Sequence, residues 1–261
     1  MKKRQLFIMT ALICCLALVS CKKEETNNNG NNDNTNPQTT GTVVSNAVTD
    51  IDGNHYNAVW IGGKLWMKEN LRTTKFPDGT NIELGHHTNN YESLRFAPNS
   101  DESIVSTYGY LYNWLAVMHG SSSSNANPSG VQGICPNGWH VPSEAEWKQM
   151  LDYVNSQTEY RSGGYNLYIA KALASKTGWQ TSTDPYTVGN NQSANDAIGF
   201  SAYPAGFALS DPAFFGTHAR FWSSTESSDN AFSPYLFYNY GSVNYDNKRK
   251  DYASSVRCVR D

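Results

Sequence analysis

The chain divides into three parts by the pattern of its apolar and polar residues. Residues 6–19 are almost entirely apolar, and residues 26–36 are polar, with seven Asn among eleven residues. From residue 48 onward, short apolar segments alternate with polar turns, which is the pattern of a folded domain. The apolar run of 14 residues is too short to cross a bilayer as a helix, which needs roughly 20 residues.

The first elements that this pattern predicts in the folded part are two strands. Aromatic and β-branched residues fill Tyr56–Ile61 and Lys64–Met67, and Gly62 and Gly63 lie between them, so we expect a β-hairpin. The preceding Asp50–Asn54 segment is typical of a turn. A calcium loop of the EF-hand type is the alternative, but its twelfth position would be Ile61 instead of Glu.

Helical periodicity is clearest in the middle of the chain. Ser143 and Glu146 form a capping-box pattern directly after Pro142. Apolar residues then recur at helical spacing, at Trp147, Met150, Leu151 and Val154. A helix is therefore predicted to begin at Ser143, and a second one over 166–175, ending near Gly178.

The remaining apolar segments are short and read as strands. They are separated by the polar stretch 180–196, which we expect to be a loop, and a hairpin turn is expected at 240–243. The predicted fold class is α+β, with two helices in the middle and mostly antiparallel sheet at both ends. The predicted strands are 200–204, 220–224, 235–240, 243–246 and 255–259.

The N-terminal segment has the layout of an export signal. Lys2, Lys3 and Arg4 precede the apolar run, and small residues lead into Cys21. This resembles a bacterial lipoprotein signal peptide, in which cleavage leaves the cysteine as the acylated, palmitate-carrying first residue. The alternatives are an ordinary secretory peptide and a short membrane anchor. We therefore expect a signal peptide over 1–20, lipidation of Cys21 and membrane attachment through that lipid.

The polar segment after Cys21 is expected to be a tether over 21–47, followed by one domain over 48–261. Such a tract buries too little apolar surface to offset its ordering entropy. The charged residues 22–25 resemble the surface-export signal of Bacteroidetes lipoproteins. This resemblance implies an outer-membrane protein exposed on the cell surface.

Charge and cysteine content limit the expected partners of the protein and the expected role of its cysteines. The chain has 20 basic and 23 acidic residues, and three of the basic ones lie in the signal peptide, so nucleic acid is not an expected partner. Cys14 and Cys15 leave with the signal peptide. The remaining Cys135 and Cys258 favour a disulfide in an exported domain over a reactive thiol pair or a metal site.

Several ordered motifs in the folded part resemble one family. That family is the Fibrobacter succinogenes major paralogous domain of exported and lipidated proteins in the Bacteroidetes and Fibrobacteres. The motifs are Asp50-Ile-Asp-Gly-Asn54, Trp66-Met-Lys-Glu-Asn-Leu71, Tyr108-Gly-Tyr-Leu-Tyr-Asn-Trp114, Cys135-Pro-Asn-Gly-Trp-His-Val-Pro-Ser143, Gly199-Phe-Ser-Ala202, Phe221-Trp-Ser-Ser-Thr-Glu226 and Ser255-Val-Arg-Cys-Val-Arg-Asp261.

Two of these stretches are also similar to signatures of the formylglycine-generating enzyme family. They are the helix start at 139–147 and the strand at 256–260. This more distant resemblance implies a loop-rich fold of the C-type lectin kind. It also implies that a Cys135–Cys258 disulfide links the helix region to the last strand, which would leave no free thiol for formylglycine generation.

Catalytic and metal-binding patterns are not evident in the sequence. The six His have no metal-ligand spacing, adjacent His86 and His87 project differently, and His140 is expected to be a hydrogen-bonded structural residue. Carboxylates in the predicted loops cannot be paired from spacing alone. We therefore expect no enzyme activity, no catalytic residue, no metal and no cofactor, with a hydrolase as the weakest alternative.

Binding is the function that the composition favours. Aromatic residues reach 13%, and Asn-rich loops accompany them, although most Trp residues are expected in the core. A protein that binds an extracellular ligand, such as a glycan, is the first expectation. A structural or adhesive surface protein making protein–protein contacts is the alternative. The candidate ligand-binding residues in the predicted variable loops are Asp184, Asn190, Asn191, Asn195, Asp196 and Glu226.

Overall fold

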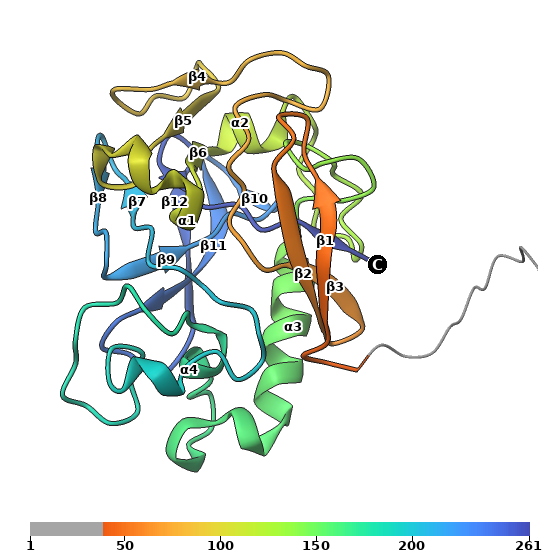
Figure 1. The fold of residues 1–261 in the computed structure, drawn as a ribbon. Coiled ribbons are helices and arrows are strands. Elements are labelled where there is room, and N and C mark those ends of the chain that lie inside the picture. The colour runs from red at the N-terminus through yellow and green to blue at the C-terminus, as the bar shows by residue number, and fades with distance from the viewer. Residues whose placement is uncertain (1–38) are drawn as a thin grey trace, which may run out of the picture. The chain divides into compact units, whose positions relative to one another are not determined.

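The computed structural model describes residues 39–261, which form an α+β domain (Figure 1). The predicted signal peptide, the lipidation site Cys21 and most of the predicted tether lie outside the described residues. Within the described part, no helix is both long and apolar enough to cross a membrane.

The first sheet has the order β1–β2–β3–β14 and contains the predicted hairpin. Its strands are β1 (Val43–Thr49), β2 (His55–Ile61), β3 (Lys64–Met67) and β14 (Val259–Arg260), all antiparallel to their neighbours. The hairpin prediction is confirmed, and both turn residues, Gly62 and Gly63, have positive φ. Strands from both ends of the described chain therefore lie in one sheet.

Strand β1 lies partly in the segment that the sequence assigned to the tether. It pairs with β2 from Val43, well before residue 48. This strand was not predicted, because the sequence of Thr42–Ala47 has no regular alternation of apolar and polar residues. In the structure these residues are exposed or half-buried. The folded domain therefore includes the last part of the predicted tether.

Two further sheets contain the remaining strands. The sheet β10–β11–β12 consists of β10 (Glu226–Ser227), β11 (Asn230–Phe237) and β12 (Asn244–Arg249), with β9 (His218–Arg220) also paired to β11. A third sheet follows the order β4–β5–β6–β13–β7–β8. Its strands are β4 (Glu83–Leu84), β5 (Leu94–Phe96), β6 (Leu111–Asn113), β13 (Ala253–Ser254), β7 (Phe207–Ala208) and β8 (Pro212–Ala213).

The longest helix is the predicted one, α3 (Glu144–Ser156), and it lies beside β2 and β3 (Figure 1). Ser143 accepts a hydrogen bond from the Glu146 N–H, and the Glu146 carboxylate accepts one from the Ser143 N–H, so the capping box is confirmed. The shorter helices are α1 (Val105–Tyr108), α2 (Trp114–Met118) and α4 (Ala170–Leu173), with 3-10 turns at Pro98–Ser100, Glu102–Ile104, Thr158–Tyr160, Ser162–Gly164 and Gln192–Ala194.

The predicted second helix is much shorter than expected. Only α4 forms within 166–175, because Leu167 has a φ of 68° and so cannot continue a right-handed helix. Exposed Tyr165 and Leu167 precede it in a loop. The apolar residues over 166–175 therefore reflect burial of α4 and of its flanking residues Ile169 and Ala174.

Most predicted strands are only partly correct, and the one predicted over 235–240 ends at Phe237. Residues 200–204 form a single bridge, Ala174 to Ala202, and the strand predicted over 220–224 ends at Arg220. Of the strand predicted over 255–259, only Val259 lies in a strand, β14, because β13 ends at Ser254 and Ser255 forms a single bridge with Phe221. These segments are buried and extended, but their backbone partners change from residue to residue, as where Trp222 N–H donates to the Ser255 carbonyl. Burial of an extended segment is therefore not sufficient for regular backbone pairing with a neighbouring strand.

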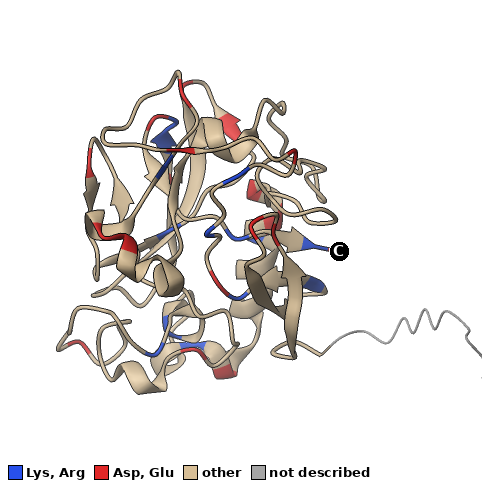
Figure 2. Cartoon of the chain, turned by 45° about the horizontal axis from the view of Figure 1, so that its top comes forward, with Lys and Arg blue, Asp and Glu red and all other residues tan. Residues whose placement is uncertain are grey.

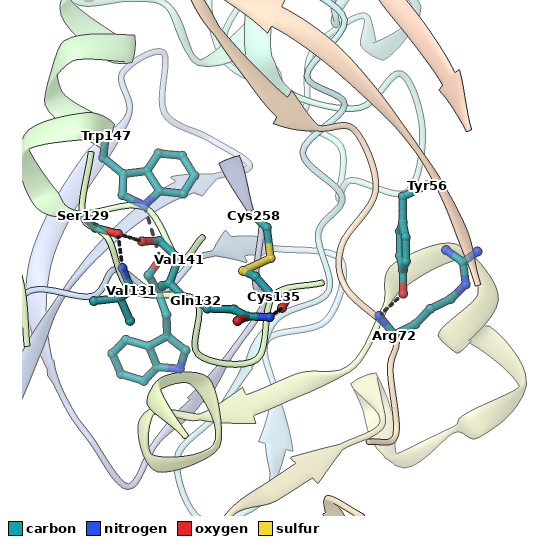
Figure 3. Close-up of a disulfide and its surroundings, with 10 residues drawn as sticks. Tyr56, Arg72, Ser129, Val131, Gln132, Cys135, Val141, Trp147 and Cys258 are labelled. Atoms are coloured by element: carbon teal, nitrogen blue, oxygen red, sulfur yellow. Dashed lines mark hydrogen bonds between the residues drawn. A yellow bond between two sulfur atoms is a disulfide. The ribbon is translucent and has the colours of Figure 1, made fainter. Parts of the chain in front are cut away.

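The core is aromatic, as the sequence predicts. Trp66, Trp147 and Trp222 are fully buried, and the rings of Trp66 and Trp147 lie 4.8 Å apart, joining β3 to α3. Trp60 is only half-buried. A disulfide joins Cys135 to Cys258 and lies in the same buried cluster as Val141 (Figure 3).

Buried Arg257 connects the last segment to the middle of the chain. Its guanidinium donates to the Asn70 side chain and to the backbone carbonyls of Met67, Phe200 and Ser201, at 2.6–2.9 Å. Burial lowers the pKa of Arg257 to about 10. This residue and the disulfide fix the segment that leads into β14.

Candidate functional site

Tyr245, in β12, is an exposed tyrosine that itself lines a groove. Burial alternates along this strand, so Tyr245, Asn247 and Arg249 point to solvent while their neighbours are half-buried. The Tyr245 side chain is 55% exposed. The strand pattern therefore presents a flat ring on the surface.

Tyr245 rests on a second ring and a cation. The Phe232 ring, from β11, lies 5.3 Å away, and Lys148 Nζ, from α3, lies 5.5 Å from the Tyr245 ring. Glu144 holds that ammonium at 2.5 Å, and this hydrogen bond raises the pKa of Lys148. The ring is thus supported from beneath and from one side.

A polar groove of about 630 Å³ opens on one side of Tyr245, which we name the Glu226 groove. Its walls are fixed by backbone contacts: Asn125 Oδ1 accepts from Ala145 N–H, and Thr225 Oγ1 accepts from Glu144 N–H, both at 2.9 Å. The polar side chains that line it include Ser123, Asn125, Glu144, Glu226, Asp246 and Asn247.

A less polar groove of about 400 Å³ opens on the other side, between α3 and β12. We name it the Lys148 groove. Apolar Leu151, Leu167 and Val243 line it together with polar Asp152, Asn155 and Asn244. Tyr245 belongs to both grooves, so it forms the ridge between them.

The carboxylates in the Glu226 groove each hold a cation. Glu144 pairs with Lys148, Glu226 with Lys250 at 2.5 Å, and Asp246 with Arg220 at 2.5 Å and Lys248 at 3.1 Å. A carboxylate already occupied by an ammonium or guanidinium is a poor nucleophile or general base. This arrangement is suited to accepting hydrogen bonds from hydroxyl groups.

Charges are mixed over the whole domain. Figure 2 shows acidic and basic positions interspersed along the ribbon, without a large region of one sign. No group of three or more His, Cys, Asp or Glu side chains in residues 39–261 has the arrangement of a metal site.

Asp50, considered above as a calcium ligand, instead accepts from the Asn54 N–H and the Tyr56 hydroxyl, so the turn prediction is confirmed.

Of the six predicted ligand-binding residues, Glu226 lines a groove beside Tyr245. Two others, Asn190 and Asn195, lie around the Lys171 ammonium: Lys171 Nζ donates to the Asn190 carbonyl at 2.5 Å and to Asn195 Oδ1 at 2.8 Å. Asn195 is buried, and its amide also donates to the Ser175 and Val188 carbonyls. The hydrogen bonds of both residues therefore stabilise the loop in which they lie.

The other three predicted residues also make local contacts. Asp184 Oδ1 accepts from Tyr186 N–H at 3.1 Å, and Asn191 Oδ1 accepts from the Ser193 hydroxyl at 2.8 Å. Asp196 Oδ1 accepts from Ser201 N–H at 2.7 Å and lies in a turn with positive φ. None of the three lines the grooves beside Tyr245.

The half-buried His140 is held by a fully buried carboxylate. His140 Nε2 lies 2.8 Å from Glu146 Oε1, and Glu146 is fully buried and also paired with Lys64 at 3.2 Å. The prediction of a hydrogen-bonded structural His140 is confirmed. Hydrogen bonds and charge pairing lower the pKa of Glu146, although burial alone would raise it.

Sequence reasoning missed Tyr245, Lys148 and Asn125 as site residues. The alternation over 243–249 was a usable signal, because it places Tyr245 on the face opposite to Asn244 and Asp246. The loop at 121–129 carried no such signal, since its place beside β10 depends on contacts more than 100 residues apart, such as Glu226 N–H with the Ser123 hydroxyl.

Comparison with known proteins identifies the family of this domain. No curated protein and no solved structure matches the chain. The model of the Fibrobacter succinogenes major domain matches residues 59–260, which contain both grooves, the disulfide and all but the first strand and part of the second. The chain therefore belongs to the Fibrobacter succinogenes major domain family.

Proposed function

We propose that this protein is a non-enzymatic, lipid-anchored surface protein that binds an extracellular glycan at Tyr245. The observation that carries the proposal is the exposed Tyr245 ring between two grooves, each with amide and carboxylate groups along its walls. An aromatic ring can stack on the apolar face of a sugar, and the surrounding oxygens and amides can bind its hydroxyl groups.

A C-type-lectin-like fold is part of the proposal. It is supported by the disulfide between Cys135 and Cys258 and by the long, loop-rich segment between α4 and β9. The resemblance of the 139–147 and 256–260 signatures is consistent with these features. A fold shared with lectins does not by itself imply sugar binding, so the grooves carry the functional argument.

The paired carboxylates support binding instead of hydrolysis. A glycosidase needs two carboxyl groups flanking the bond, one able to donate a proton and one acting as nucleophile or base. In the Glu226 groove, Lys148, Lys250 and Arg220 occupy the three carboxylates. Release of reducing ends from a bound polysaccharide would contradict the non-enzymatic assignment.

The location proposed here rests on the signal sequence. Acylated Cys21 would anchor the protein in the outer membrane, and residues 22–25 would direct it to the cell surface. Palmitate labelling that persists in the Cys21→Ser variant would contradict this assignment.

A glycan array tests the binding proposal. The probe is the secreted chain with Cys21→Ser, and the comparison is between the parent, Tyr245→Ala and Tyr240→Ala. Tyr240 is 45% exposed but lines neither groove, so it controls for the loss of an exposed tyrosine. We expect Tyr245→Ala to weaken binding by roughly tenfold or more and Tyr240→Ala to leave it unchanged. Absence of binding to any glycan by the folded parent would refute the proposal.

A structural or adhesive role through protein–protein contacts is the second candidate. The observation that favours it is a surface cluster of apolar side chains before α4. Tyr165 is 54% and Leu167 58% exposed, and the Tyr165 ring lies 5.4 Å from Tyr168. Exposed apolar clusters of this kind are typical of protein contact sites. Loss of adhesion in Tyr165→Ala but not in Tyr245→Ala would favour this role.

A further inference from the structure

A third groove continues the line of the two that flank Tyr245. It measures about 590 Å³ and lies at the far end of β12, where Asn90, Trp114, Asp229, Arg249, Lys250 and Asp251 line it. We name it the Trp114 groove. Lys250 Nζ lies 4.7 Å from the Trp114 ring and pairs with Glu226, so this ion pair stands between the Trp114 groove and the Glu226 groove.

The three grooves follow one strand in order. Asn244 and Tyr245 line the Lys148 groove, Tyr245 to Asn247 line the Glu226 groove, and Arg249 to Asp251 line the Trp114 groove. A strand rises about 3.3 Å per residue, so the six steps from Asn244 to Lys250 span roughly 20 Å. This length greatly exceeds that of one sugar ring.

The charges that line the three grooves favour a neutral chain over a polyanionic one. Six carboxylates line the three grooves, and they belong to Glu144, Asp152, Glu226, Asp229, Asp246 and Asp251. Three basic groups line the grooves, and Arg220 and Lys248 pair with Asp246 beside them, so acidic groups remain in slight excess. The three basic groups each have an acidic partner: Lys148 has Glu144, Lys250 has Glu226, and Arg249 has Asp251 at 2.7 Å. A polyanionic chain would meet like charge and paired cations, which disfavours its binding.

We infer that the strand β12 binds a neutral oligosaccharide chain of several units, lying across all three grooves with Tyr245 near its middle. This inference rests on the proposed function and adds the length and charge class of the ligand. The Tyr245 ring supplies the stacking surface, and polar side chains on both sides bind hydroxyl groups of successive sugar units.

Length dependence tests the inference. The lipid-free chain is titrated calorimetrically with neutral ladders of gluco-, xylo- and manno-oligosaccharides of one to six units, and with oligogalacturonates as the acidic counterpart. We expect affinity for one neutral ladder to rise at least about tenfold from the disaccharide to the hexasaccharide, since more contacts form as each groove is filled. We expect no measurable affinity for the acidic ladder.

Two variants assign the contacts to grooves. Asp229→Ala, at the exposed wall of the Trp114 groove, should weaken hexasaccharide binding several-fold and leave disaccharide binding unchanged. Tyr245→Ala should weaken both. Equal loss for both lengths in Asp229→Ala would contradict the extended site.

The outcomes separate this inference from the proposed function. If a monosaccharide or disaccharide binds as tightly as the hexasaccharide, the extended site is refuted and glycan binding stands. If the acidic ladder binds more tightly than the neutral ones, the charge class is refuted. If no ladder binds and the glycan array is also negative, the proposed function itself is refuted.

Discussion

His218 shows how a single residue can make the domain sensitive to pH. Its ring lies among Phe207, Phe214 and Phe237, with the Phe237 ring 4.4 Å away. Burial, with the nearby Arg220 and Lys248 cations, lowers the pKa of His218 to about 4, against a smaller opposing effect of Asp246. A ring held neutral in the folded state is protonated in the unfolded chain at mildly acidic pH.

The lowered pKa of His218 predicts that the stability of the fold falls as the pH falls. The unfolded chain takes up a proton near pH 6.5 and the folded state only near pH 4, so His218 stabilises the fold fully above about 6.5 and loses that contribution between 6.5 and 4. The melting temperature should therefore fall less between pH 7.5 and 4.5 in His218→Phe than in the parent. Parallel curves for the two proteins would contradict the assignment, while His55→Phe, whose ring is in an exposed residue, provides the control.

For single residues, the sequence correctly predicted the roles of those whose hydrogen-bond partners lie close to them in the chain. The Ser143–Glu146 cap, the turn at Asp50 and structural His140 were predicted because their partners lie within six residues. Arg257 and Lys171 were not, since their partners lie far along the chain or on backbone carbonyls that a sequence pattern does not mark.

At the level of elements, the junction between α1 and β6 depends on a close backbone approach. Gly109 ends α1 with a φ of 71°, and a Cβ there would lie 2.5 Å from Asn70 Cβ and 2.8 Å from the Leu71 carbonyl oxygen. Only glycine fits both the backbone angle and the space.

Gly120 provides a matched control for this junction, because it has a φ of 76° but open space around its missing Cβ. Both Gly→Ala changes pay for the left-handed backbone, about 1 kcal/mol. Gly109→Ala should cost at least about 2 kcal/mol more, since Asn70 and the chain beside it must move. Denaturant unfolding measures the difference, and equal losses would show that the junction can relax.

The sequence predicted the elements whose apolar residues recur with the period of a strand or a helix. It did not predict the irregular elements. The β2–β3 hairpin and α3 follow from alternation, turn residues and a cap. The strands predicted over 200–204 and 255–259 are only partly correct, because these buried segments pair mainly through single bridges. The Tyr245 site required knowing that 121–129 lies beside β10, which no local pattern shows.

For the whole molecule, the Cys135–Cys258 disulfide closes a long loop. The two residues are 123 positions apart, and cross-linking a loop of that length restricts the unfolded chain by roughly 4–5 kcal/mol at most. The paired substitution Cys135→Ser/Cys258→Ser should lower the free energy of unfolding by about 2–5 kcal/mol.

A single variant and a reductant test whether the bond itself stabilises the fold. Cys135→Ser alone should lose about as much stability as the double variant, because either change removes the bond. Reductant should lower the melting temperature of the parent and leave the double variant unchanged. A parent insensitive to reductant after complete unfolding and refolding would contradict a stabilising role for the bond.

Strand β14 pairs with β3 across nearly the full length of the folded domain, at Val259 with Trp66 and Arg260 with Leu65. The first sheet therefore cannot be completed until residues 259–260 are available for pairing. Contacts this distant along the chain form slowly, because closing so long a loop costs conformational entropy. In a nascent chain of this topology, the edge of β3 that pairs with β14 therefore stays open until residues 259–260 have been synthesised.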